Sequence, residues 1–295
     1  HTHTPQALYV AHDKPNDPTT LSLAKLPPPQ PQTVRLVLVS DTHQQLADVA
    51  LPDGDILCHT GDITFCARGG YDTLVQFNDH LRSLPHGHKV IIGGNHDRHL
   101  EMMGKEAARE LVSAAHYLEN SGVSLCGLHL WGTPFSPSHK GKRSHNRAFQ
   151  YSESRQRLVM RYIPNDVDVL LTHGGADNDH VQGAIRRIRP MLHASGHDHA
   201  HHGASSIAWD TAPRGVDGRP RASAAESSIL VNAAICDPKY QPVQLPVVVD
   251  LLPTPTTRPE TRHPAARASA ADDRQRAGDA FAAAVRLRAS RAKGA

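Results

Sequence analysis

The sequence predicts an α/β domain in which two β-sheets pack together and helices cover their outer faces. Short runs rich in Val, Ile and Leu recur along the chain, stretches with helical spacing lie between them, and further strand-like runs follow. Strands that alternate with helices are typical of α/β folds, and nearly continuous apolar runs are typical of strands covered on both faces.

Each predicted element follows from its local pattern. Four apolar runs end at polar residues and are predicted to be buried strands: 34–39, 55–59, 89–92 and 167–171. Apolar side chains near a 3.6-residue period predict a helix at 71–84, and 105–115 and 152–162 also have helical patterns. Strand-like stretches at 121–131, 228–235 and 245–251 then supply a second group of strands.

Composition divides the chain into three parts. Residues 1–32 are polar and Pro-rich and are predicted to be an extended N-terminal arm. Residues 33–252 form the predicted domain, in which 204–227 is rich in Ala, Ser, Gly, Pro and Arg and is predicted to be an insertion loop. Residues 253–295 are a basic Ala/Arg-rich tail whose segment 272–293 contains strong helix formers.

The bulk composition predicts a cytoplasmic protein without a membrane association. Of 295 residues, 39% are hydrophobic and 21% charged, and no apolar run approaches the roughly 20 residues that cross a bilayer. Residues 1–31 lack the pattern of a signal peptide, and the four cysteines are unclustered, which favours a reducing compartment. Because the chain begins with His1 rather than Met, the loss of a preceding targeting segment remains an alternative.

The excess of positive charge lies in the tail. The whole chain has a net charge of +3, and residues 253–295 carry nine Lys/Arg and four Asp/Glu, so the remainder is slightly acidic. The main body is therefore not expected to bind nucleic acid.

Five short polar motifs carry the chemistry of this sequence. They occur at or near the ends of apolar runs: Asp41-Thr42-His43, Gly61-Asp62, Gly93-Gly94-Asn95-His96-Asp97, Thr172-His173-Gly174 and Gly196-His197-Asp198-His199. Together they supply carboxylates, imidazoles and an amide, which are ligands suited to two adjacent divalent metal ions. Because functional groups collect beyond the carboxyl ends of strands in α/β sheets, these motifs are predicted to converge.

Spacing explains how each motif binds. Side chains two residues apart share one side of an extended chain, so Asp41 and His43 can chelate one ion, as can His197 and His199. The carboxylate of Asp62 has two oxygens and can bridge two ions. Each motif alone also fits a polar loop, a Gly-Asp turn or a histidine-rich surface; their conjunction and order favour the metal site.

The third and fourth motifs add a neutral ligand and a candidate acid. Asn95 offers a carbonyl oxygen without charge, whereas His96 is predicted to lie beside the metals and to protonate a leaving oxygen. Asp97 is predicted to fix the tautomer of His96, although Asn and Asp also favour helix N-caps. His173 follows an apolar strand, where a single histidine is often a core residue.

In this order the motifs resemble those of the calcineurin-like metallophosphoesterase superfamily, which run D-x-H, G-D, G-N-H-D/E, H and G-H-x-H. The match extends over residues 34–199. Four further pieces resemble the MPPED-type (metallophosphoesterase domain-containing) branch: Phe77-Asn78, Leu84-Pro85-His86, Trp131-Gly132-Thr133-Pro134-Phe135 and Pro190-Met191-Leu192-His193.

The resemblance implies a four-layer αββα sandwich of two mixed sheets and a site for two metal ions. One ion would be bound by Asp41, His43, Asp62 and His199, and the other by Asp62, Asn95, His173 and His197. Asp62 would bridge the two ions together with a hydroxide that acts as the nucleophile. The mixed nitrogen and oxygen ligands suit Mn, Fe, Zn or Co rather than an all-oxygen Mg site.

The predicted function is therefore that of a dinuclear metal-dependent phosphoesterase, specifically a phosphodiesterase for small nucleotide-like esters, with His96 as the acid. The alternatives are the same site acting on a non-phosphate electrophile or a specialised metabolite, and a non-catalytic scaffold. Phe65 stands where the purple acid phosphatase branch has a metal-binding Tyr, so no tyrosinate ligand is expected. The basic segment 138–147 either holds phosphate or is a solvated loop, and no residue is assigned to substrate binding.

Overall fold

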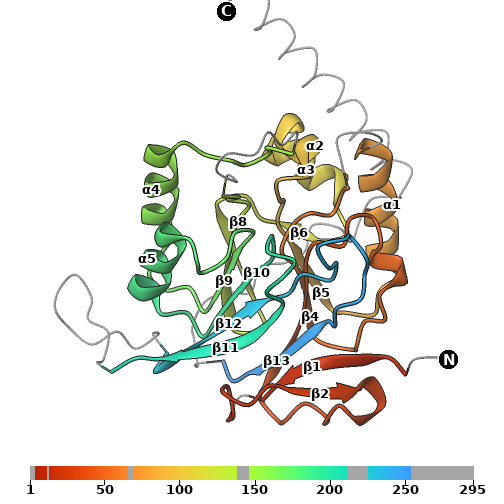
Figure 1. The fold of residues 1–295 in the computed structure, drawn as a ribbon, viewed down its shortest axis with the longest axis vertical. Coiled ribbons are helices and arrows are strands. Elements are labelled where there is room, and N and C mark those ends of the chain that lie inside the picture. The colour runs from red at the N-terminus through yellow and green to blue at the C-terminus, as the bar shows by residue number, and fades with distance from the viewer. Residues whose placement is uncertain (1–3, 12, 66–69, 138–145, 211–224, 254–295) are drawn as a thin grey trace, which may run out of the picture.

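A computed structural model of the chain, described here for residues 4–11, 13–65, 70–137, 146–210 and 225–253, has four layers. Two mixed β-sheets face each other in the middle, and Figure 1 shows helices on both outer sides. The α/β class and the αββα arrangement predicted from the sequence are confirmed.

The first sheet has seven strands in the order β2-β1-β13-β3-β4-β5-β6. Strands β3, β4, β5 and β6 run parallel, β13 is antiparallel to β3, and β1 is parallel to β13. The bounds are β1 Gln6–Val10, β2 Thr19–Ser22, β3 Val34–Val39, β4 Ile56–His59, β5 His88–Ile91, β6 His116–Tyr117 and β13 Val247–Leu251.

The second sheet has six strands in the order β11-β12-β10-β9-β8-β7, with β8, β9, β10 and β12 parallel and an antiparallel strand at each edge. The bounds are β7 Ser121–Leu125, β8 Leu128–Thr133, β9 Val169–Thr172, β10 Leu192–Ser195, β11 Gly203–Ala208 and β12 Ser227–Asn232.

The core between the sheets is built by strand alternation. In β3, Leu36 and Leu38 belong to the buried cluster that also contains Val169 and Leu171 of β9 in the other sheet. Their neighbour Val37 belongs to the cluster that includes the helices. Both faces of β3 are therefore covered, which explains the unbroken apolar run in its sequence.

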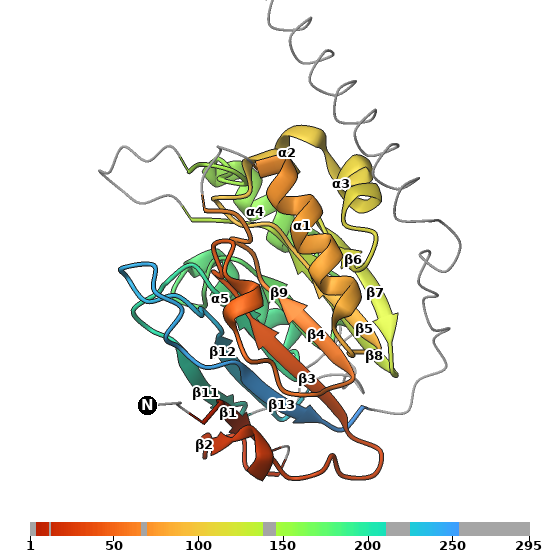
Figure 2. The ribbon, with the colours of Figure 1, turned by 90° about the vertical axis from the view of Figure 1, so that its right-hand side faces the viewer.

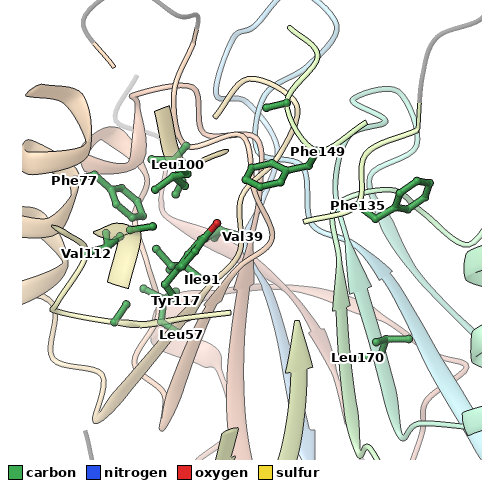
Figure 3. Packing of buried hydrophobic residues seen from close by; sticks show 14 of the residues in the cluster. Val39, Leu57, Phe77, Ile91, Leu100, Val112, Tyr117, Phe135, Phe149 and Leu170 are labelled. Atoms are coloured by element: carbon green, nitrogen blue, oxygen red, sulfur yellow. The ribbon is translucent and has the colours of Figure 1, made fainter. Parts of the chain in front are cut away.

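Five α-helices in the described part of the chain complete the outer layers. Their bounds are α1 Gly70–Ser83, α2 Arg98–Met103, α3 Lys105–Leu111, α4 Glu153–Tyr162 and α5 Asp179–Ile188, and the short 3-10 helices are η1 Leu23–Lys25 and η2 Leu46–Asp48. Leu74, Phe77 and Leu81 of α1 are buried at helical spacing. Figure 3 shows Phe77 beside Leu100 and Val112 at the outer face of the first sheet.

Several elements differ from the sequence prediction. The stretch 121–131 is a hairpin rather than one strand, because Cys126 and Gly127 have positive φ angles of 50° and 77° and turn the chain between β7 and β8. Helices α2 and α5 are additional. The predicted helices at 71–84, 105–115 and 152–162 correspond to α1, α3 and α4 with slightly different ends.

The predicted N-terminal arm and insertion loop each contribute to a sheet. Strand β1, within 1–32, buries Ala7 and Val10 and pairs with β13, so this segment is not a separate arm throughout. Strand β11, which overlaps the start of the predicted 204–227 loop, pairs with β12 along six residues. Neither strand was predicted, because the Pro-rich composition of the first segment and the small residues of the second are not typical of strands. Residues 211–224 and 254–295, including the predicted tail helix, lie outside the described residues.

A buried ion pair fastens β13 and the N-terminal strand to the sheet. Arg35 of β3 donates from Nε and Nη2 to the two carboxylate oxygens of Asp250 in β13, at 2.8 Å each. The hydroxyl of Tyr9 in β1 donates a hydrogen bond of 2.9 Å to the Asp250 carboxylate. Figure 2 shows β1, β13 and β3 side by side at this edge. No described helix is both long and apolar enough for a membrane span.

Candidate metal centre

The sequence-predicted site residues come together at one edge of the sandwich. Strands β3, β4 and β5 are parallel neighbours in the first sheet, and β9 and β10 are parallel neighbours in the second. The predicted ligands follow the carboxyl ends of these five strands: Asp41 and His43 after β3, Asp62 after β4, Asn95 after β5, His173 after β9, and His197 and His199 after β10. The site thus lies where both sheets end.

One group of ligand atoms comprises Asp41, His43 and His199. Nε2 of His199 lies 3.2 Å from Oδ1 of Asp41 and 3.2 Å from Nε2 of His43. All three potential ligand atoms lie within 4.8 Å of one another. Asp41 is fully buried, and His43 is 2% exposed, so these atoms face an enclosed position.

A second group surrounds Asn95. Its Oδ1 lies 2.7 Å from Nδ1 of His197 and 3.1 Å from Nε2 of His173. Asp62 stands between the groups: Oδ1 lies 3.4 Å from Nε2 of His173, and Oδ2 lies 4.0 Å from Nε2 of His43. The two oxygens of one carboxylate therefore approach different groups.

Backbone carbonyls orient three of the imidazoles. Nδ1 of His43 pairs with the Thr64 carbonyl at 3.1 Å, and Nδ1 of His199 pairs with the Asp237 carbonyl at 2.9 Å. Nδ1 of His173 likewise pairs with a main-chain carbonyl, at 2.8 Å. A carbonyl only accepts, so each Nδ1 carries the proton and, in the neutral ring, each Nε2 presents a lone pair to the site.

The backbone at the site is strained. Asp41, His43, Asp62 and His197 have φ angles of 52°, 43°, 55° and 70°, in the left-handed region that residues with a Cβ seldom adopt. Such conformations cost of order 1–3 kcal/mol each and occur where the surrounding structure over-determines them. The fold therefore maintains these four positions at a cost in stability.

Close approach explains the glycines of two motifs. A Cβ on Gly94 would lie 2.3 Å from Oδ1 of Asp62, and a Cβ on Gly196 would lie 2.1 Å from Oδ2 of Asp41. That same Oδ2 accepts the backbone N–H of His197 at 2.9 Å. The glycines thus let the loops of different strands approach the two carboxylates closely.

Neighbouring charges govern protonation at the site. Burial alone would raise the pKa of Asp62, but His173, His96 and His43 hold it well below its ordinary value. Burial opposes protonation of His173, yet the adjacent Asp62 raises its pKa to about 9. Burial likewise acts against ionisation of Asp41, and the hydrogen bond from His199 keeps the pKa of Asp41 lowered. Both carboxylates are therefore anionic near neutral pH.

His96 lies beside the ligand groups. Its Nδ1 donates to the carbonyl of Phe65, and its Nε2 lies 3.8 Å from Oδ2 of Asp62 and 3.2 Å from the amide nitrogen of Asn146. The imidazole is 7% exposed and its backbone N–H donates to Asp62 Oδ1 at 2.8 Å. The ring is thus held with Nε2 directed at the site.

The predicted role of Asp97 in orienting His96 is not what the structure shows. The Asp97 carboxylate accepts backbone N–H groups of Ile63, Thr64 and Gly94 at 3.2, 2.8 and 2.8 Å. Burial raises its pKa to about 6. Asp97 therefore ties the loop after β4 to the loop after β5, and the backbone of Phe65 takes the position beside Nδ1 of His96.

Two aromatic residues at the rim were not assigned a site role from the sequence. The Tyr240 ring centroid lies 4.9 Å from that of His43 and 5.2 Å from that of His199. Phe65 lies 5.0 Å from Tyr240. No motif marks Tyr240, which belongs to the loop between β12 and β13. Residues 138–145 of the predicted basic loop lie outside the described residues.

The ligand set fits divalent metal ions. Metal–nitrogen and metal–oxygen bonds of about 2.0–2.2 Å place neighbouring ligands of one ion roughly 3 Å apart. The 3.2 Å separation between His199 Nε2 and Asp41 Oδ1, and the 3.1 Å separation between His173 Nε2 and Asn95 Oδ1, match this value. Nε2 of His43 and Nε2 of His199 also lie 3.2 Å apart, close enough for both nitrogens to bind one cation once neither carries a proton.

The fold and this cluster define a metallophosphoesterase. The profile of the family described as "Calcineurin-like phosphoesterase" matches residues 34–201, and the chain belongs to that family.

Named relatives agree with this assignment. A UPF0046 protein of Caenorhabditis elegans is 31% identical over 257 residues, covering 74% of this chain and 81% of the relative. Metallophosphoesterase domain-containing protein 1 of Homo sapiens is 29% identical over 268 residues, covering 77% and 74%. A second UPF0046 protein of C. elegans is 32% identical over 198 residues, covering 59% and 66%.

Proposed function

We propose that this protein is a dinuclear metal-dependent phosphoester hydrolase that acts on phosphodiesters of small nucleotide-like molecules. One observation carries the proposal: imidazole nitrogens oriented by backbone carbonyls converge with two buried anionic carboxylates, and Asp62 directs one oxygen to each ligand group. Asp41, His43, Asp62 and His199 would hold one ion, and Asp62, Asn95, His173 and His197 the other.

Bound there, two divalent ions would lower the pKa of a shared water and offset the charge of the phosphoryl oxygens. The chain supplies the remaining functions. Asp41 and Asp62 are 0% and 2% exposed, so their negative charges would face the ions rather than bulk water. Asn95 adds a ligand without further charge, which limits repulsion of the anionic substrate.

His96 is proposed as the general acid. The Phe65 carbonyl keeps the Nδ1 proton in place, so the proton donated to a leaving oxygen comes from Nε2, which faces the site. A positioned acid of this kind contributes about 10²–10⁴-fold to rate. Asp97 contributes indirectly, because it holds the loops that carry Asp62 and His96.

Metal content tests the proposal directly. The protein is stripped with chelator, reloaded with Mn, Co, Ni or Zn, and analysed for metal per chain. Asp62→Ala is expected to lose both ions because Asp62 approaches both groups, whereas Asp48→Ala, a change at an exposed carboxylate in η2, retains them. Retention of two tightly bound ions by Asp62→Ala would contradict the bridging role.

Turnover tests the reaction class. Each metal-loaded form is assayed with an aryl phosphodiester, the matching phosphomonoester, and a panel of carboxylic esters and lactones. We expect the diester to be hydrolysed with the highest kcat/KM. Hydrolysis of only the carboxylic esters or lactones would show that the enzyme attacks a carbonyl carbon rather than phosphorus. No turnover with any metal would refute a hydrolytic function.

A further inference from the structure

The rim of the site carries two aromatic rings in a fixed arrangement. Phe65 is 43% exposed, and Tyr240 is half-buried. Their centroids lie 5.0 Å apart with ring planes at 79°, an edge-to-face contact. The two rings come from the loop after β4 and the loop between β12 and β13, so the fold brings them together from distant sequence positions.

Both rings border the histidines of the site. Besides its contacts with His43 and His199, the Tyr240 ring lies 6.1 Å from the ring of His96. Phe65 lies 5.9 Å from His43 and 6.4 Å from His96. Both rings therefore lie close enough to the histidines to contact an ester group of a phosphate bound at this centre.

The Tyr240 side of this pair is a built feature rather than a loose loop. Tyr240 has a left-handed φ of 60° in a turn where its N–H donates to the Asp237 carbonyl at 2.8 Å. The same carbonyl accepts from His199 Nδ1 at 2.9 Å. Gln45, two residues after His43, donates to the Tyr240 carbonyl at 3.2 Å. These hydrogen bonds therefore hold the Tyr240 turn in place relative to His43 and His199.

The backbone of Phe65 also contacts the site, since its carbonyl accepts a hydrogen bond from Nδ1 of His96. The Phe65 ring has no group that makes a hydrogen bond. Because the carbonyl belongs to the backbone, a side-chain substitution at Phe65 removes the ring and leaves this hydrogen bond available. The ring and the catalytic geometry can thus be tested separately.

We propose that Phe65 and Tyr240 form an aromatic subsite that binds the flat aromatic or heteroaromatic group of the phosphoester substrate. The inference rests on the proposed function, because the phosphate must occupy the metal centre for its ester group to reach the rings. Exposed aromatic faces stack on flat heterocycles with little regard to their hydrogen-bonding pattern. The subsite therefore selects for an aromatic substituent and not for one particular base.

The experiment compares two ligands that share a phosphate and a sugar: adenosine 5′-monophosphate and ribose 5-phosphate. Dissociation constants are measured by calorimetry on Zn-loaded protein, and saturation-transfer NMR on the same diamagnetic form reports which ligand protons contact the chain. The nucleotide should bind about 5- to 150-fold more tightly than the sugar phosphate, the range that base stacking supports.

Variants separate the rings from the metal centre. In Phe65→Ala and Tyr240→Ala the affinity ratio should fall toward one, with saturation transfer to the adenine protons reduced, ribose 5-phosphate affinity unchanged and metal content retained. Tyr240→Phe should restore the ratio, because the ring and not the hydroxyl makes the contact. Tyr162→Ala, at a tyrosine that is 72% exposed on α4, is the matched control and should leave the ratio unchanged.

The outcomes distinguish the two proposals. An unchanged ratio in both alanine variants, or an equal loss of affinity for both ligands, overturns the aromatic subsite and leaves the phosphoesterase proposal standing. Failure of the metal-loaded wild-type protein to bind either ligand overturns the phosphate site and the subsite with it.

Discussion

Replacing Gly196 by alanine should displace Asp41, a proposed metal ligand. A Cβ at this position would lie 2.1 Å from Oδ2 of Asp41 and 2.0 Å from Oγ of Ser40, whereas ordinary contact begins at 3.4 Å. The Asp41 carboxylate would therefore have to retreat by about 1.3 Å, or the loop after β10 would have to move by a similar amount. Either movement also disturbs the 2.9 Å hydrogen bond from the His197 N–H to Asp41.

A shift of that size exceeds what metal coordination tolerates. Metal–ligand distances are held within about 0.2 Å, so Asp41 can no longer bind in its original position. Since changes to groups that merely support ligands already weaken metal affinity about 10- to 100-fold, we expect Gly196→Ala to lose at least tenfold. Overpacking should also cost roughly 1–3 kcal/mol in the free energy of unfolding of the metal-free protein.

The assay is a competition titration against a chromophoric chelator, combined with urea unfolding in the absence of metal. Gly183→Ala is the matched control: Gly183 lies within α5, and a Cβ there meets no atom within 4 Å. That change should leave metal affinity unaltered and stabilise the protein by about 0.5–1 kcal/mol. Wild-type metal affinity in Gly196→Ala would refute the close-approach argument.

Four further predictions concern single side chains. His96→Asn should retain metal while kcat falls about 10²–10⁴-fold in steady-state assays, and an unchanged kcat would exclude His96 as the acid. Metal binding at pH 7 should release a proton from His173, whose pKa is raised to about 9 in the metal-free protein; calorimetry in buffers of different ionisation enthalpy measures this release, and its absence would contradict the charged His173. Burial lowers the pKa of His193 from 6.5 to about 3, so between these pH values the unfolded chain binds one more proton than the folded chain. The free energy of unfolding therefore decreases as the pH is lowered, by up to about 1.4 kcal/mol per pH unit. His193→Gln should reduce this pH dependence in urea titrations at several pH values, and an unaltered dependence would contradict the prediction. Asp250→Ala should cost about 3–5 kcal/mol in urea unfolding by leaving Arg35 buried without its partner, whereas Arg35→Met combined with Asp250→Leu should recover most of the loss; equal losses would argue against the ion pair.

The convergence of the site could be predicted because the end of each strand and the type of ligand that follows it are both encoded locally. Strands β3, β4, β5 and β9 correspond to apolar runs that are followed within a few residues by the predicted ligands, whereas no strand was predicted at β10, before His197 and His199. Parallel strands end at a common edge, so these four local observations combine into one location. The role of each ligand at that location stays a prediction that metal analysis must test.

The groups that orient the histidines of the site could not be predicted in the same way. The groups that orient His43, His199 and His96 are main-chain carbonyls of Thr64, Asp237 and Phe65, and every residue type has a carbonyl. The sequence pattern therefore indicates a neighbouring side chain, Asp97, for this role. Backbone position, which depends on the whole fold, decides these contacts.

The edges of the two sheets were hidden for a different reason. Strand β1 gains its place by pairing with β13, which is more than 230 residues away in the chain. Its own sequence has only a short apolar pattern, of which Ala7 and Val10 are buried. Pairing partners this distant leave no local periodicity, so composition alone suggested an arm.

The position of His173 beside Asp62 bears on how the carboxylates are held together before metal binds. Asp41 and Asp62 are both buried and anionic, and two such charges repel each other strongly in a poorly solvated environment. A protonated His173, 3.4 Å from Asp62, offsets part of this charge while the backbone holds its ring by Nδ1. A divalent ion would then exchange for that proton without reorganising the ligands. The strained backbone at Asp41 and Asp62 fits this reading, because a preformed site needs its ligand geometry fixed by the fold.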